Sequence, residues 1–181
     1  IGFSQPHWAG EKPGARPLAD ARIPAAYIDL ARLDQGAVIE VPIHYQPVSS
    51  AHARGQYYQT AHGHPMLNTN QLIRRPDLLR FRELVVGNSF LHSLANISRT
   101  TPPYTIDIGD IKTLKEQGFR WLIAHKRIPA DTVGLAGSSA SADFLTASAW
   151  ALLYTLTGQP VIDSGDTLVF DLNQALTRFG D

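Results

Sequence analysis

The hydrophobic and polar positions divide the chain into an irregular start and a remainder in which helical and extended patterns alternate. Proline and glycine recur through the first 24 residues, and neither the helical nor the strand period runs through them. We therefore predict a Pro/Gly-rich linker or surface arm over residues 1–26 and a single α/β domain over residues 27–181.

Short apolar runs predict the strands of this domain. The β-branched run 37–41 is the first, and Pro42 should end its hydrogen-bond ladder because proline lacks a backbone donor. Residues 119–124 are apolar on both faces, as expected for a central strand covered by helices on two sides. A short helix is expected over 27–33 and a further short strand over 65–68.

Helical spacing and capping residues predict the helices. Pro76 stands where a first helical turn tolerates proline, and the apolar positions from 78 to 94 then follow helical spacing, with Gly87-Asn88 dividing the helix in two. Asp107 is an expected N-cap, and Gly118 is an expected left-handed stop.

The last third of the chain predicts a loop, a helix and a hairpin. Residues 128–142 are rich in Ala, Gly and Ser, and a long helix is expected from about Asp143. The runs 161–162 and 167–172 flank a short Gly-containing turn and predict an antiparallel pair that closes the chain. Together the patterns predict a three-layer α/β domain with a mixed, mainly parallel sheet, flanking helices and a C-terminal β-hairpin.

Composition narrows the possible functions. The chain has 181 residues, 44% hydrophobic and 18% charged, and its 16 basic side chains balance 16 acidic ones, which argues against a nucleic-acid partner. The absence of cysteine excludes disulfides, thiolate metal sites and a cysteine nucleophile. No apolar run reaches the ~20 residues of a membrane span. Because the chain begins with Ile1, we expect a processed protein or a piece of a longer one.

The densest group of polar side chains runs from Gln56 to Arg75, and Arg54 lies just before it. Amide, phenol and imidazole groups beside aromatic faces suit hydroxyl-rich ligands, since a sugar hydroxyl both donates and accepts while its C–H face lies on a ring. An alternative is that these side chains only tie a long loop to the sheet. The candidate ligand-binding residues are Arg54, Gln56, Tyr57, Tyr58, Gln59, His62, His64, Asn70 and Arg74.

A metal site is a weaker interpretation of the histidines. His62 and His64 stand two positions apart, so on an extended chain they share a face, and His44 or His52 could supply a third ligand. No carboxylate lies nearby in sequence. We therefore predict no metal and no other cofactor.

Other patterns assign no catalytic residue. The Gly- and Ser-rich stretch 137–141 does not match Gly-x-Ser-x-Gly. Glu40, Asp107, Asp110 and Asp163 stand near element ends, but their spacing does not pair them, and Asp107 and Asp110 suit a helix N-terminus.

A family resemblance adds to this picture. The run Gln56-Tyr57-Tyr58-Gln59-Thr60-x-His62-Gly63-x-Pro65, preceded by Val38-Ile39-Glu40-Val41-Pro42 and followed by Arg74, resembles the C-terminal soluble region of large bacterial polytopic membrane proteins. Those proteins are similar to C-type glycosyltransferases. The later pattern Leu114-Lys115-x-x-Gly118-Phe119-Arg120-Trp121-Leu122-Ile123-x-His125-Lys126 also resembles that family, so the resemblance covers roughly residues 35 to 172.

The resemblance implies an extracytoplasmic accessory domain of a bacterial glycosyltransferase-like protein. Its partners would be its own transmembrane region, from which the N-terminal arm would suspend it, and a carbohydrate or lipid-linked sugar acceptor. Alone it would not be catalytic. Two alternatives stay open: a stand-alone hydrolytic enzyme with His62 or His64 as general base beside Glu40 or Asp107, and a structural interaction module of an envelope assembly.

Overall fold

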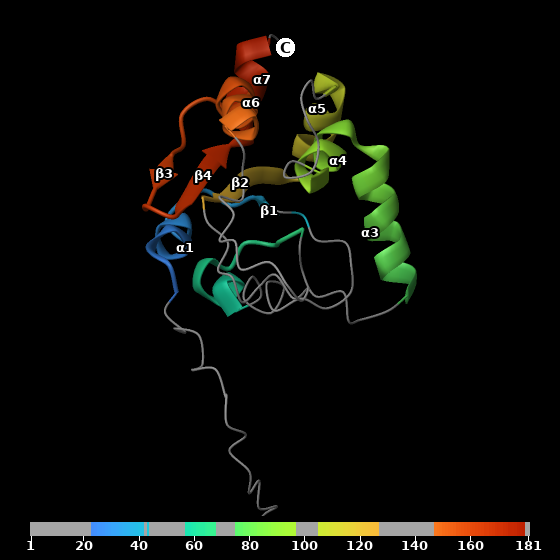
Figure 1. The fold of residues 1–181 in the computed structure, drawn as a ribbon. Coiled ribbons are helices and arrows are strands. Elements are labelled where there is room, and N and C mark those ends of the chain that lie inside the picture. Colours follow the sequence, from blue (N-terminus) through green and yellow to red (C-terminus); the bar gives the residue numbers. More distant parts are fainter. Residues whose placement is uncertain are drawn as a thin grey trace, which may run out of the picture.

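The computed structural model describes residues 23–41, 43, 57–67, 75–96, 105–126 and 147–179. Residues 57–62 are helical and carry no label in Figure 1. The labelled elements are α1 (Ala25–Leu30), β1 (Ala37–Val41), α3 (Arg75–Gly87), α4 (Ser89–Asn96), α5 (Ile108–Glu116), β2 (Phe119–His125), α6 (Ala147–Thr157), β3 (Ile162–Asp163), β4 (Thr167–Asp171) and α7 (Leu172–Phe179).

The sheet has four strands in the order β1-β2-β4-β3. β1 runs parallel to β2, whereas β4 is antiparallel to both β2 and β3. These findings confirm the α/β class, the mixed sheet and the C-terminal hairpin. Fewer of the strand pairings are parallel than predicted. In the described part of the chain, the parallel pairings are the β1–β2 pair and one isolated bridge from Val38 to Met66.

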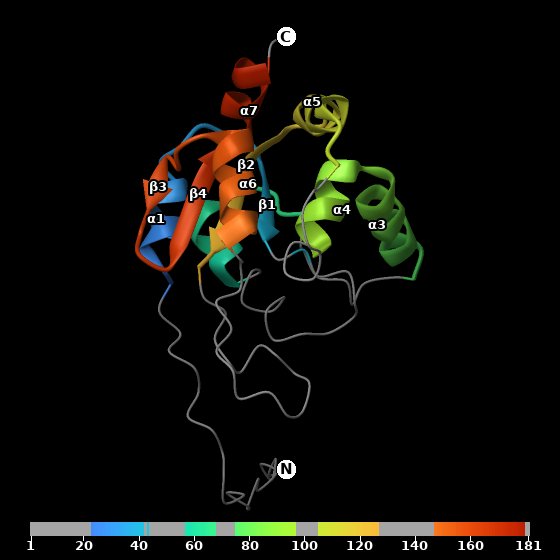
Figure 2. The ribbon, with the colours of Figure 1, turned by 45° about the horizontal axis from the view of Figure 1, so that its top comes forward.

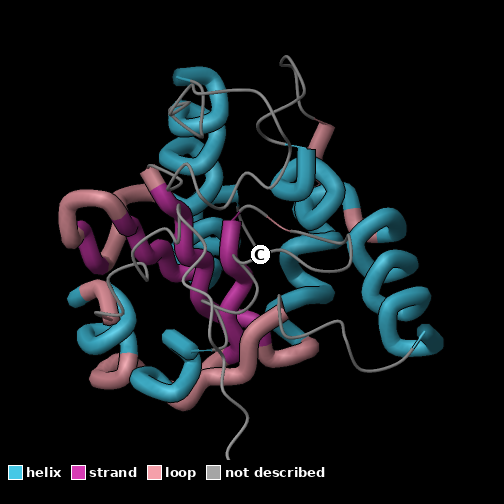
Figure 3. Tube along the Cα trace, turned by 60° about the horizontal axis from the view of Figure 1, so that its bottom comes forward, coloured by secondary structure: helices cyan, strands magenta, loops and turns pink. Residues whose placement is uncertain are grey.

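Helices cover both faces of the sheet, which gives the three predicted layers. Figure 1 shows α1 and the helical residues 57–62 on one side of the strands and α6 and α7 on the other, and Figure 3 shows the strands enclosed by helices. Successive side chains of each strand point alternately into these two helical layers. Val38 and Val169 pack towards α1, whereas Ile39 and Phe170 join the larger core under α3 to α7. In Figure 2, α3 lies outside α4.

Local signals explain where several helices begin and end. The Asp107 carboxylate accepts the Gly109 backbone N–H at 2.8 Å, which caps α5 as predicted. Gly118 has φ +91°, a left-handed conformation in which a side chain would be strained, and β2 follows directly. Asn88 separates α3 from α4 and accepts the Leu91 N–H at 2.9 Å, so the predicted division is confirmed.

The C-terminus requires a correction. The sequence predicts that the hairpin closes the chain, but α7 follows β4 without a loop. The Asp171 carboxylate accepts the Asn173 N–H at 2.9 Å and starts this helix. Its buried residues Leu172 and Ala175 belong to the larger core, which explains why the helix returns onto the sheet.

Several predicted segments lie partly or wholly outside the described residues. These are most of the N-terminal arm, the loop 128–142 and the start of the helix expected from Asp143. The strand expected over 65–68 is reduced to the single bridge at Met66. Among the helices in the described ranges, none combines the length and apolar character that crossing a bilayer requires.

Candidate ligand-binding site

A row of polar side chains crosses three strands at one end of the α1 face. Glu40 pairs with Ile123 across the parallel β1–β2 ladder, and His125 stands two residues further along the same face. Thr167 pairs directly with His125 on β4. The carboxyl ends of adjacent parallel strands are where open α/β sheets commonly place ligand sites. With Tyr27 of α1, these three residues form what we call the polar cluster.

Hydrogen bonds join the polar cluster into one unit. The Tyr27 hydroxyl donates to Glu40 Oε1 at 2.6 Å, and His125 Nε2 lies 2.7 Å from the same oxygen. Tyr27 Oη and His125 Nε2 are 3.1 Å apart. On the other edge of the imidazole, Nδ1 lies 3.4 Å from Thr167 Oγ1. The carboxylate oxygen therefore accepts from two rings and links α1, β1 and β2.

The polar cluster is partly accessible, and its phenol is held protonated. The side chains of Glu40 and His125 are 12% and 20% exposed. Burial raises the pKa of Tyr27 well above its usual value, and the negative charge and hydrogen bond of Glu40 raise it further. Tyr27 is therefore a hydrogen-bond donor at neutral pH and not a base.

The carboxylate, imidazole and hydroxyl stand in the order of a hydrolase triad, but the hydroxyl is poorly placed for catalysis. Thr167 is only 4% exposed, and its 3.4 Å contact to Nδ1 is long for a hydrogen bond. Both nitrogens of His125 face protein groups in this arrangement. The geometry therefore suits a fixed binding surface better than a reacting base.

Aromatic rings lead from the molecular surface to the polar cluster. Tyr57 is 47% exposed, and its ring centroid lies 5.9 Å from that of Tyr58. Tyr58 in turn lies 4.6 Å from Tyr27. Tyr27 stacks at 5.9 Å on His62 and at 6.2 Å on His125. We call these five side chains the ring row.

His62 is the member of the ring row with an unsatisfied polar atom. Its Nδ1 accepts the His64 backbone N–H at 3.0 Å, and its Nε2 is buried and has no hydrogen-bond partner among the described residues. The side chain is 5% exposed. Burial first and the neighbouring His64 second lower its pKa from 6.5 to about 4, against an opposing effect of Glu40. The ring is therefore neutral at pH 7, with its proton on Nε2.

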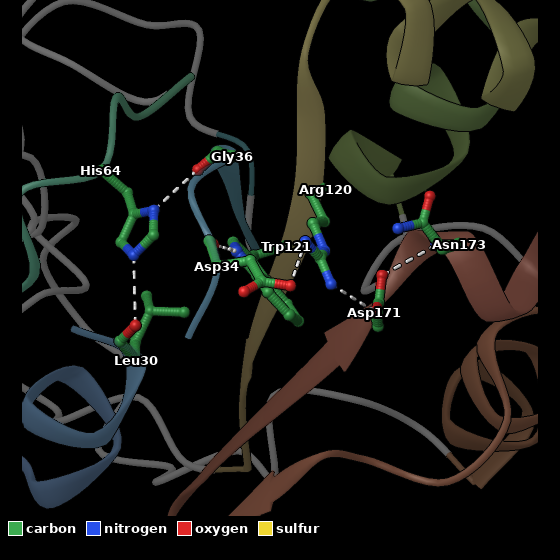
Figure 4. A network of polar contacts seen from close by, with 8 residues as sticks. All are labelled: Leu30, Asp34, Gly36, His64, Arg120, Trp121, Asp171 and Asn173. Atoms are coloured by element: carbon green, nitrogen blue, oxygen red, sulfur yellow. Dashed lines mark hydrogen bonds and ion pairs between the residues drawn. The ribbon is translucent and has the colours of Figure 1, made fainter. Parts of the chain in front are cut away.

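His64 and Gln59 hold a loop to the sheet, as the alternative interpretation of this segment describes. The two ring nitrogens of His64 lie 3.0 Å from the Gly36 carbonyl oxygen and 3.1 Å from that of Leu30 (Figure 4). The Gln59 amide donates to the His64 carbonyl at 3.0 Å. These contacts fix the connection between α1 and β1 and leave neither His64 nitrogen available to a ligand or a metal.

A second network, at the amino end of β2, fixes the same connection from its other side (Figure 4). The Arg120 guanidinium lies 2.9 Å from Asp34 and 3.6 Å from Asp171, and Trp121 Nε1 donates to the Asp34 carbonyl at 2.9 Å. In the described part of the chain, Arg120 Nε is buried and has no hydrogen-bond partner, although the cation is paired through its other two nitrogens. A Cβ at Gly36 would lie 2.5 Å from Arg120 Cβ, so this backbone approach requires glycine.

The predicted site residues thus fall into three groups. Tyr57, Tyr58 and His62 come together on the ring row, whereas Gln59 and His64 serve the loop. The other four candidates, Arg54, Gln56, Asn70 and Arg74, lie outside the described residues. In the described ranges, no group of three or more His, Asp or Glu side chains could hold a metal ion.

Sequence reasoning missed Tyr27, His125 and Thr167 as members of a site. It considered Glu40 as a carboxylate that its spacing does not pair and, in the enzyme alternative, as a partner of His62 or His64, but not of His125. A usable signal did exist, because Glu40 interrupts an otherwise apolar strand and His125 ends another, and a polar group on a buried strand needs a partner. The sequence alone does not place those two strands side by side.

The acidic residues considered with Glu40 have structural partners. Asp107 caps α5, Asp110 accepts the Ser89 N–H at 2.6 Å, and Asp163 lies 2.9 Å from Lys126 Nζ. Of the carboxylates considered from the sequence, Glu40 is therefore the one that contacts a histidine, and that histidine is His125.

Comparison with known proteins found no matching family model, no similar curated protein and no similar solved structure. The resemblance to the soluble region of glycosyltransferase-like membrane proteins therefore stays a prediction.

Proposed function

We propose that this chain is an extracytoplasmic accessory domain of a bacterial membrane glycosyltransferase-like protein, not catalytic alone, that recognises a carbohydrate or lipid-linked sugar acceptor. The observation that carries the ligand class is the ring row, which runs from exposed Tyr57 to the carboxylate of Glu40. Flat rings beside a fixed carboxylate and a neutral imidazole provide both a C–H stacking surface and hydroxyl partners.

The engagement of His125 supports a binding role. Its Nε2 contacts Glu40 and its Nδ1 faces buried Thr167, so the imidazole would have to give up a protein contact before it could exchange a proton with a substrate. The parent protein, its membrane and the extracytoplasmic location rest on the sequence resemblance.

A binding assay tests the ligand class. The chain of residues 1–181 is applied to an array of immobilised glycans and to vesicles that contain a polyprenyl-phosphate-linked sugar. We expect specific retention by at least one of them, weakened in Tyr57→Ala. The matched control is Leu79→Ala on α3, which removes an apolar side chain of similar exposure, 51% against 47%. Absence of binding, or equal loss in both variants, would contradict the proposal.

The location is tested on the parent protein. We expect protease added to intact spheroplasts to release the domain, and the complete reading frame to encode membrane-spanning segments before Ile1. Protection of the domain until the membrane is lysed would place it on the other side and exclude the proposed location.

A second candidate, a hydrolytic enzyme, is favoured by the 2.7 Å contact between Glu40 and His125, because a carboxylate-oriented imidazole is a common general base. The base would then be His125 and not His62 or His64. The test is turnover of chromogenic glycosides and esters by the chain and by His125→Gln. We expect no turnover by either; hydrolysis that His125→Gln abolishes would establish the enzyme instead.

A further inference from the structure

The unpartnered N–H of His62 identifies one contact that the bound ligand should make. Nδ1 already accepts the His64 backbone N–H, so the proton of the neutral ring lies on Nε2. That N–H is buried, and it makes no hydrogen bond to any of the residues that the structure describes. Most buried donors in folded proteins are bonded, so an exception calls for a missing partner.

Ring contacts place this donor beside the polar cluster. His62 stacks on Tyr27, whose hydroxyl donates to Glu40. His62 stacks on its other side against His64, which fixes the plane of the ring. From Tyr27, the ring row continues through Tyr58 to Tyr57 at the surface, so aromatic faces extend from the solvent to the His62 donor.

The charged side chains that the structure describes near His62 disfavour an anionic ligand group. Glu40 contributes a carboxylate close enough to influence the His62 ring, and Tyr27 is a neutral phenol. Lys126, next to His125, lies 2.9 Å from Asp163 and is already paired. A phosphate or carboxylate bound here would meet a negative charge, whereas a hydroxyl would meet donors and acceptors.

We infer that this site binds an uncharged sugar residue, with the sugar ring against Tyr57 and Tyr58 and one sugar oxygen accepting the Nε2–H of His62. The inference rests on the proposed function and makes it more specific. If the ligand is a lipid-linked sugar, the site contacts its neutral sugar and not its phosphate. Because Nε2 is sealed from solvent, binding includes a local rearrangement of side chains that admits the sugar oxygen.

Two substitutions of His62 separate its two hydrogen-bonding roles. In His62→Asn, the side-chain oxygen of the introduced asparagine can still accept the His64 N–H, but nothing then reaches the position of Nε2. The longer amide in His62→Gln can donate near that position. The probes are methyl β-glucoside, methyl β-galactoside and methyl β-N-acetylglucosaminide, each titrated into the chain of residues 1–181. Methyl β-glucuronide is the control, because it differs from the glucoside by a negatively charged carboxylate.

We expect at least one neutral glycoside to bind and the glucuronide to bind more weakly than the glucoside. His62→Asn should weaken the binding of the neutral glycoside about tenfold, the effect of losing one hydrogen bond. His62→Gln should stay within about threefold of the wild type. If His62→Asn does not fold, the wild-type His62 Nε2 proton provides a direct readout, since its NMR signal should shift and exchange more slowly when sugar is added.

The outcomes distinguish this inference from the broader proposal. If no glycan, lipid-linked or free, binds the wild-type chain, both fail. If sugars bind but His62→Asn binds them as well as the wild type, or the His62 Nε2 signal does not respond to sugar, the inference alone fails. Preferential binding of the glucuronide would likewise overturn it and leave sugar recognition intact.

Discussion

Polar side chains are buried at both ends of the sheet, but their hydrogen-bond partners differ between the two ends. At the amino ends of β1 and β2, His64, Trp121 and Arg120 are directed at backbone carbonyls and carboxylates of a loop (Figure 4). At the carboxyl ends, Tyr27 and His125 converge on one oxygen of Glu40, and the His62 ring stacked on Tyr27 has an N–H that bonds none of the described residues. The first end is bonded as a scaffold, and we call it the scaffold end. The second contains the candidate ligand-binding site, and we call it the ligand end.

The strongest test of the scaffold end is His64→Phe. Phenylalanine keeps a ring in the buried position but donates to neither the Leu30 nor the Gly36 carbonyl. An imidazole in its neutral form has one N–H and donates to one of these two carbonyls, and one buried acceptor left without a donor costs about 1–3 kcal/mol. We therefore expect the free energy of unfolding to fall by up to about 3 kcal/mol in urea denaturation. A loss below about 1 kcal/mol would show that the loop between α1 and β1 does not depend on His64.

Lowering the pH should reduce the free energy of unfolding through protonation of His62 at the ligand end. Its folded-state pKa of about 4 lies below the value of 6.5 in the unfolded chain, so between these two pH values the unfolded state binds more protons and stability falls as pH falls. The loss should reach about 2–3 kcal/mol by pH 4. His62→Asn lacks this titration, so the stability difference between wild type and variant should change by that amount from pH 7 to pH 4. A pH-independent difference would contradict the assigned pKa.

Removal of the carboxylate at the ligand end should have an intermediate effect. Glu40→Gln replaces two charge-assisted hydrogen bonds by weaker neutral ones, and we expect urea denaturation to show a loss of about 2 kcal/mol. The pKa of Tyr27 should fall in an alkaline tyrosinate titration, although burial still keeps it above the ordinary value. The control is Glu83→Gln on the exposed surface of α3, for which neither quantity should change.

The smallest effect is expected from the charge pair at the scaffold end. The Asp34 side chain is 76% exposed, so its 2.9 Å contact with Arg120 is screened by water. Asp34→Asn should lower the free energy of unfolding by about 0.5 kcal/mol, and added salt should reduce the difference further, because the backbone carbonyl bonded to Trp121 is unchanged. A loss of several kcal/mol would mean that the ion pair, and not the carbonyl contacts, holds this loop.

Local sequence signals were sufficient for most of the fold. The run 37–41, the Asp107 cap and the Gly118 stop each depend on neighbouring residues, and each appears where it was expected. The error at the C-terminus arose because Leu172 fits the preceding strand as well as the helix that it begins. Asp171 was the available signal, since an aspartate before a Leu-Asn-Gln-Ala sequence is a typical N-cap.

The candidate site was less predictable because it is not local. The dense polar segment contains His62 and the tyrosines of the ring row, Tyr57 and Tyr58, but its sequence does not separate His62 from His64, which differ in the atoms that surround them and not in residue type. Glu40 and His125 are 85 residues apart in sequence, and only the β1–β2 register joins them. The pairing of β1 with β2 depends on how the whole core packs and not on the sequence of either strand alone.

The long sequence separation within the polar cluster also has a consequence for folding. Tyr27 and His125 lie 98 positions apart, and Thr167 stands a further 42 beyond His125. Loops of this size close late, because the chain entropy lost on closure is recovered only when many contacts have formed. The intact cluster should therefore be among the last features to appear during refolding, and a fragment that ends before β4 cannot complete it because Thr167 is missing.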